Sequence, residues 1–291
     1  MSEIVATTTL PEIAREIRLN LRDNYDQVVA ITGLKKGMGK SHLAIQLGEQ
    51  IDDNFDYKKN IAYLPDSEQI QKQFNELKRY QCYDVDEAIK VLYKLRWMDK
   101  LQQIITEMYE TERKQNKCTL LLIPRFRDLT ENFRNHQVDI WINIIARGLA
   151  VVRMKDPDQD VKDPWYFDIN ERRKKDMFGS EKIWRITLEK RIQAESRMKN
   201  YVGTFFFDAL PDEKEQLYLA CHKEAKDNMP PPVEKTRGRR QEKDDLFRYR
   251  AIKKFQAMGI TLKEIGDMTN VTPGAISNLI KDIEKRHPEL V

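Results

Sequence analysis

Cysteine is scarce in this sequence, and its spacing argues against two kinds of site. The chain has 291 residues and three cysteines, and no two of them form a CxxC pair. An odd and sparse set predicts free thiols rather than a disulfide framework. Cys221 and His222 are adjacent but have no second pair of ligands, so we do not expect a structural zinc site. The cysteines are Cys82, Cys118 and Cys221.

Long apolar runs are also missing. No segment is long and apolar enough to cross a bilayer, and the N-terminus lacks the pattern of a signal peptide. Hydrophobic residues make up 40% and charged residues 34% of the chain, which predicts a soluble globular protein. We therefore expect a cytoplasmic protein with no membrane partner. Residues 156–171 are acidic and contain proline, which predicts a loop or insertion, and we interpret the carboxylates at 156–168 as solvated rather than as a nuclease site.

Positive charge is unevenly distributed, although the net charge is only +4. Residues 235–286 contain 13 Lys and Arg against 7 Asp and Glu, while the rest of the chain contains 38 against 40. A basic C-terminal part beside a near-neutral body indicates where a polyanion would bind. Double-stranded DNA is the expected partner.

The most informative motif that is present is a glycine-bearing loop with Lys-Ser at its end. It follows an apolar run at 28–31, typical of a buried strand, and precedes a helical pattern at 42–47. This arrangement predicts a P-loop, whose converging backbone N–H groups and helix N-terminus hold phosphates. Standard spacing puts a glycine where Leu34 stands, so the first glycine is one residue early. The residues expected to bind nucleotide are Gly33, Lys35, Lys36, Gly37, Met38, Gly39, Lys40, Ser41 and His42.

Within this loop two side chains have expected roles of their own. Lys40 would neutralise the β- and γ-phosphates of ATP, and the Ser41 hydroxyl would ligate Mg²⁺. Hydrolysis needs more than a P-loop. Asp86 and Glu87 follow the third predicted strand, so we expect Asp86 to hold the metal, through water or directly, and Glu87 to polarise the attacking water. Arg125, which follows the next strand, is the expected stabiliser of transition-state charge, with Arg127 as second choice.

Apolar runs alternate with helical patterns, which predicts an α/β fold. Because several runs are apolar on both faces, we expect a mostly parallel sheet flanked by helices. The expected strands are 28–31, 60–64, 80–85, 119–123, 140–145 and 201–207, and the expected helices lie within 1–24, 66–77 and 89–116.

The chain divides into two predicted domains. An ATPase domain spans 1–229, with a lead-in helix in 1–24, and a Pro-rich, basic linker spans 230–243. Residues 244–291 then form a small all-α domain.

The C-terminal domain has the pattern of a helix-turn-helix. Thr261 and Glu264 form a capping box, Asn270 suits the turn, and Thr272-Pro273 begins the second helix. A three-helix protein-interaction module is the alternative; the basic linker favours DNA. The residues expected to contact DNA are Arg237, Arg239 and Arg240 in the linker, and Thr272, Ser277, Asn278 and Lys281 on the second helix.

These motifs together resemble a known group of proteins. The series 31–41, 60–63, 86–88 and 123–126 is similar to P-loop ATPases of phages, archaeal viruses and mobile elements, of the zonular-occludens-toxin-like and FtsK/HerA-type. The resemblance covers roughly residues 25–150. It implies a RecA/ASCE-like P-loop NTPase fold, ATP and Mg²⁺ as cofactors, a homo-oligomer (ring or dimer) that translocates or packages DNA, and, for a virus-encoded chain, a location in the host cytoplasm.

Two other interpretations stay open at this point. Lys35 resembles the early lysine in the deviant P-loop of ParA-like ATPases, which would indicate a partition or transposition-type ATPase. That family expects an Asp at the end of the second strand, where Pro65 or nearby Asp66 stands, and residues 86–88 fit translocases better. A regulator that binds DNA and senses nucleotide without turnover is the third interpretation.

Overall fold

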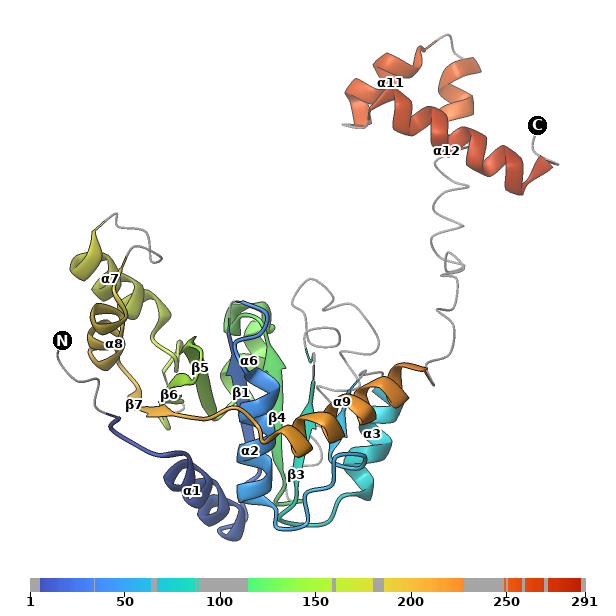
Figure 1. Ribbon diagram of the computed structural model, residues 1–291. Helices are drawn as coiled ribbons and strands as arrows, with labels where there is room; N and C mark the ends of the chain where they lie inside the picture. The colour runs from blue at the N-terminus through green and yellow to red at the C-terminus, as the bar shows by residue number, and fades with distance from the viewer. Residues whose placement is uncertain are drawn as a thin grey trace. The chain divides into compact units, whose positions relative to one another are not determined.

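The computed structural model describes residues 6–33, 35–63, 67–86, 88, 115–158, 161–179, 186–227, 249, 251–257, 260–269 and 272–288. The chain separates into two compact units, Met1–Asn228 and Met229–Val291. The first unit is mixed α/β, and the described part of the second is helical (Figure 1). No helix within the described ranges is long and apolar enough to span a membrane.

A twisted sheet forms the centre of the first unit. Five neighbouring strands run parallel, and the last two join antiparallel at one side, so the predicted α/β fold with a mostly parallel sheet is confirmed. In spatial order the seven strands seen in the described residues are β2 (Ile61–Ala62), β3 (Cys82–Val85), β4 (Cys118–Ile123), β1 (Gln27–Thr32), β5 (Ile140–Ala146), β6 (Leu149–Met154) and β7 (Tyr201–Phe206).

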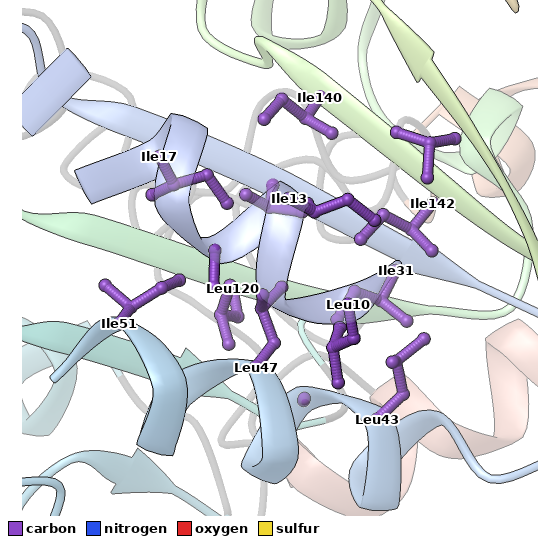
Figure 2. Packing of buried hydrophobic residues seen from close by; sticks show 14 of the residues in the cluster. Leu10, Ile13, Ile17, Ile31, Leu43, Leu47, Ile51, Leu120, Ile140 and Ile142 are labelled. Carbon is purple, nitrogen blue, oxygen red and sulfur yellow. The ribbon is translucent and has the colours of Figure 1, made fainter. Parts of the chain in front are cut away.

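Helices cover both faces of this sheet, because side chains of a strand point alternately to its two sides. On β1, Val29 and Ile31 pack in a cluster with residues of α1 (Leu10–Arg22) and α2 (Lys40–Ile51). Figure 2 shows Ile31 among the side chains of these helices. Val28 and Ala30 pack on the opposite side, in a cluster with α3 (Ser67–Glu76) and α6 (Glu131–His136). A two-sided core explains why these strands are apolar throughout.

The N-terminal helix α1 forms where the sequence predicts a lead-in helix. Thr9 and Glu12 make a reciprocal capping box, and Ile13, Ile17 and Leu21 are buried on the face toward α2. Just before this helix, the Thr7 backbone N–H donates to the Thr204 carbonyl at 2.9 Å, which covers part of the exposed edge of β7.

Several elements differ from the sequence-based expectation. β6 was not expected; it pairs with β5 through a tight turn at Arg147-Gly148, with Gly148 at φ +77°. The strand expected from residue 80 begins at Cys82, because Tyr80 has φ +70° and ends a turn. β2 is limited to Ile61–Ala62.

Helices also replace segments expected as loop or left unassigned. The expected loop at 156–171 ends early, since α7 (Phe167–Phe178) begins inside it. Two further helices, α8 (Leu188–Ser196) and α9 (Asp212–Asp227), were not expected.

The second unit contains α11 (Leu262–Thr269), α12 (Pro273–Arg286) and a helical segment at 251–257. The capping box expected at Thr261 and Glu264 is present, and the Thr272 side chain caps α12 with Pro273 in its first turn. Ile252, Ile265 and Ile276 form the small core. The linker 230–243 and the expected turn residue Asn270 lie outside the described residues, as does most of the helix expected at 89–116.

Candidate nucleotide-binding site

Parallel strands bring the expected site residues to one edge of the sheet. Gly33, Asp86 and Arg125 each come just after the carboxyl end of β1, β3 or β4. β4 lies between β1 and β3, so these two strands are about 9.5 Å apart, at two strand spacings. Open parallel sheets bind ligands at this edge.

The loop between β1 and α2 has the backbone that a phosphate cradle requires. Gly37 and Gly39 have φ of +75° and +93°, which a side chain would disfavour. Gly39 is the N-cap of α2 and carries no side chain to bond the first N–H groups of the helix, so these groups suit an anion. Lys40 Nζ donates to the Gly33 carbonyl at 3.4 Å and therefore lies over the loop.

β1 is tied to β5 directly below this loop. Trp141 Nε1 donates to Thr32 Oγ1 at 2.8 Å, and Thr32 Oγ1 donates to Asn143 Oδ1 at 2.9 Å. Because Thr32 is the last residue of β1, this chain of bonds fixes the point at which the loop begins.

A tyrosine from α9 contacts one of the two expected metal ligands. Tyr218 OH donates to Asp86 Oδ2 at 2.5 Å. Burial, together with the neighbouring Asp86 carboxylate, raises the pKa of Tyr218 well above its usual value, so the hydroxyl remains a donor. The Asp86 carboxylate therefore receives a hydrogen bond from a distant helix at the edge of the sheet where the P-loop lies.

A second carboxyl group lies on the same face of β3. Asp84 is 1% exposed, and neither of its oxygens has a hydrogen-bond partner in the described residues. Burial raises the pKa of Asp84 well above its usual range, and the nearby Asp86 raises it further. The sheet thus has an unsatisfied acidic group immediately below Asp86.

His42 has a different environment from its neighbours in the loop. Its Nδ1 accepts from the Leu210 backbone N–H at 3.4 Å, and its Nε2 lies 3.7 Å from Glu215 Oε1. The side chain therefore faces α9, while its backbone belongs to the first turn of α2.

The two arginines expected near the γ-phosphate differ in their contacts. Arg125 is exposed and is the N-cap of a short 3₁₀ turn, η2 (Phe126–Asp128). Arg127 forms an ion pair with Glu171 at 2.8 Å and lies over the Phe167 ring at 4.7 Å from the centroid. These contacts occupy Arg127, which leaves Arg125 as the better placed of the two.

These residues fit a nucleotide with Mg²⁺. Ser41 and Asp86 supply a hydroxyl and a carboxylate oxygen, which are the hard donors that Mg²⁺ takes together with phosphate oxygens and water. No group of three or more His, Cys, Asp or Glu in the described ranges is arranged to hold a metal by itself. A metal at this place would therefore bind jointly with a phosphate ligand.

The topology places most of the expected site residues at one edge of the sheet. Lys40 and Ser41 begin α2 after the loop that contains Lys35, Lys36 and Met38, and Asp86 and Arg125 follow β3 and β4. Their roles remain predictions. The proposed base Glu87, the irregular loop position Leu34, and the linker arginines Arg237, Arg239 and Arg240 lie outside the described residues.

Sequence reasoning missed Tyr218 and Asp84. Tyr218 is separated from Asp86 by 132 positions, and no local pattern marks it. Asp84 had a usable signal, since a carboxylate inside the apolar run Cys82–Val85 is unusual for a buried strand.

Comparisons with known proteins give little information about this chain. No protein-family model matches the chain, and no curated protein matches it. A solved structure with some similarity is the N-terminal domain of zonular occludens toxin from Neisseria meningitidis. The match has 18% sequence identity and a TM-score of 0.32, and it covers 44% of this chain and 83% of that chain. A likeness this weak carries no functional argument.

Proposed function

We propose that this chain is a Mg²⁺-dependent P-loop ATPase that acts on double-stranded DNA. The observation that carries the proposal is the convergence of the glycine loop, Lys40 and Ser41 with Asp86 at one edge of a parallel sheet. If the loop were only a structural turn between a strand and a helix, nothing would require a carboxylate at the end of β3, two strands away.

Each residue has a physical role in this function. The N–H groups of the loop and Lys40 bind the phosphates, and Ser41 and Asp86 hold the metal. Bound Mg²⁺ would neutralise charge on the β- and γ-phosphates. Glu87, next in the chain, accepts a proton from the attacking water, and Arg125 stabilises the charge that develops.

The second unit supports the DNA part of the proposal. Thr272, Asn278 and Lys281 are exposed on α12, and Ser277 is half-buried. Ser and Asn suit base edges, and Lys suits a phosphate. We propose a helix-turn-helix that places α12 in the major groove, with the basic linker on the backbone. The ATPase would work as a cytoplasmic homo-oligomer.

The test is ATP turnover with and without double-stranded DNA. The wild-type rate should rise with DNA, and Lys40→Ala and Glu87→Gln should abolish it, while Lys72→Ala on α3 should retain it. DNA binding without turnover in any condition would contradict the ATPase and favour a nucleotide-sensing regulator. Loss of ATP-dependent dimerisation in Lys35→Ala would instead favour the partition-type ATPase.

A further inference from the structure

Helix α9 lies along the nucleotide-binding side of the first unit. Before it begins, the Asp208 carbonyl accepts from Gln46 Nε2 of α2 at 2.7 Å. Within it, Lys214 Nζ lies 2.6 Å from Glu49 Oε2 of α2. Cys221 packs in a cluster with residues of α2 and β2. α9 therefore borders the P-loop helix without being part of the strand–loop–helix motif.

Tyr218 is the residue through which α9 reaches the expected metal ligand Asp86. Its ring packs against Tyr63, with centroids 5.5 Å apart, and its hydroxyl donates to Asp86. Glu215 of α9 also lies 3.7 Å from His42, and Lys58–Glu224 is an exposed ion pair, but neither contact involves Asp86. Among the described residues, the hydroxyl of Tyr218 thus links this helix to the metal side of the site.

A metal bound directly by Asp86 Oδ2 competes with this hydrogen bond. Neighbouring ligands of an octahedral Mg²⁺ lie about 3 Å apart, since each bond is about 2.1 Å long. The Tyr218 oxygen lies 2.5 Å from Asp86 Oδ2, closer than a neighbouring metal ligand would stand. The hydroxyl and the metal therefore compete for this carboxylate oxygen.

We propose that Tyr218 is a positioning residue that acts as a latch, exchanged for Mg²⁺-nucleotide when the site is loaded. This inference rests on the proposed nucleotide site and adds a conformational consequence to it. Release of the hydroxyl loosens the middle of α9, which ends at Asp227, immediately before the second unit begins at Met229. The nucleotide state of the site thereby reaches the segment that leads to the second unit.

The experiment compares Tyr218→Phe with Tyr63→Phe in the full chain. Tyr63 is a matched control because its buried hydroxyl donates to the Tyr57 carbonyl and not to Ser41 or Asp86. Affinity for a fluorescent ATP analogue is measured in Mg²⁺ and in EDTA. Tyr218→Phe should bind about tenfold more tightly than wild type in Mg²⁺ and equally in EDTA, because a competing bond to a charged group is gone. Tyr63→Phe should keep the wild-type ratio of the two affinities.

Hydrogen exchange of residues 212–227 gives a readout independent of affinity. Mg²⁺-nucleotide should speed exchange in wild-type α9, and Tyr218→Phe should exchange fast without nucleotide. Three outcomes would overturn the latch while leaving the nucleotide site intact. Tyr218→Phe could change affinity equally in Mg²⁺ and in EDTA, or it could bind more weakly than wild type in Mg²⁺. Alternatively, Mg²⁺-nucleotide could leave hydrogen exchange in wild-type α9 unchanged. A wild type that binds no nucleotide would instead overturn the proposed function, and the latch with it.

Discussion

Gly39 shows how strongly single residues determine the site. Its φ of +93° is unfavourable for any side chain, and an added Cβ would lie 3.1 Å from Phe207 Cε2. Gly33 differs, because a Cβ there would meet its neighbours at an ordinary 3.6 Å. The two glycines of one loop therefore have different constraints.

Gly39→Ala should destabilise the first unit by about 1–2 kcal/mol and weaken ATP binding, because the left-handed backbone is strained. Gly33→Ala in the same loop is the control, and its free energy of unfolding should stay within about 0.5 kcal/mol of the wild-type value. Urea unfolding followed by tryptophan fluorescence measures this, since all four tryptophans lie within residues 1–228. Equal stability of the two variants would contradict the interpretation.

At this scale the sequence allowed a local motif to be predicted, but not a distant contact. Lys40 and Ser41 were identified by spacing along ten residues of chain. Tyr218 was not, because its contact with Asp86 depends on how α9 packs against α2. Periodicity cannot supply such a contact, since the partner lies in another element.

Among the elements, β6 and α8 are joined by a buried ion pair. Arg153 bonds Glu195, their side chains are 3% and 8% exposed, and Lys174 of α7 bonds Glu195 at 2.8 Å. Burial alone would raise the pKa of Glu195, but Arg153 and Lys174 outweigh it and hold the pKa below its usual value. This carboxylate therefore stabilises the fold only while it is ionised.

Glu195→Gln should lower the free energy of unfolding by about 3–5 kcal/mol at pH 7, because it leaves a buried arginine without its charged partner. In the wild type, ionised Glu195 raises the free energy of unfolding above the unfolded-state pKa of about 4.3, and this stabilisation is lost as pH falls through the lower folded-state pKa. The difference in free energy of unfolding between wild type and Glu195→Gln should therefore shrink in acid. Glu189→Gln, an exposed change on the same helix, is the control. A pH-independent difference would show that the ion pair is not its source.

The elements of the parallel sheet were predictable, and the antiparallel addition was not. Strands β1, β4 and β5 are apolar on both faces, so their runs are unmistakable. β6 follows β5 after only two residues, so in the sequence the two strands look like a single apolar segment that is interrupted at Arg147-Gly148. Half of the residues of α9 are charged and only Cys221 is fully buried, which left little amphipathic signal.

For the whole molecule, the proposed function requires an ATP site in the first unit and DNA binding by the second. Lys281→Ala should weaken binding to all DNA sequences alike and lower the slope of log affinity against log salt by about 0.9, the loss of one phosphate contact. Lys226→Ala removes an equal charge from exposed α9 and should leave the slope unchanged. An unchanged slope for Lys281→Ala would remove this residue from the DNA interface.

The central claim is that the loop at 33–41 binds ATP with Mg²⁺, and an equilibrium titration tests it most directly. Wild-type protein should bind ATP with Mg²⁺ at one site per chain, and Lys40→Ala should bind at least about tenfold more weakly, through loss of a charge-assisted contact to phosphate. Lys72→Ala, on the exposed side of α3, should bind as wild type does. Equal binding by Lys40→Ala, or no binding by wild type, would contradict the claim.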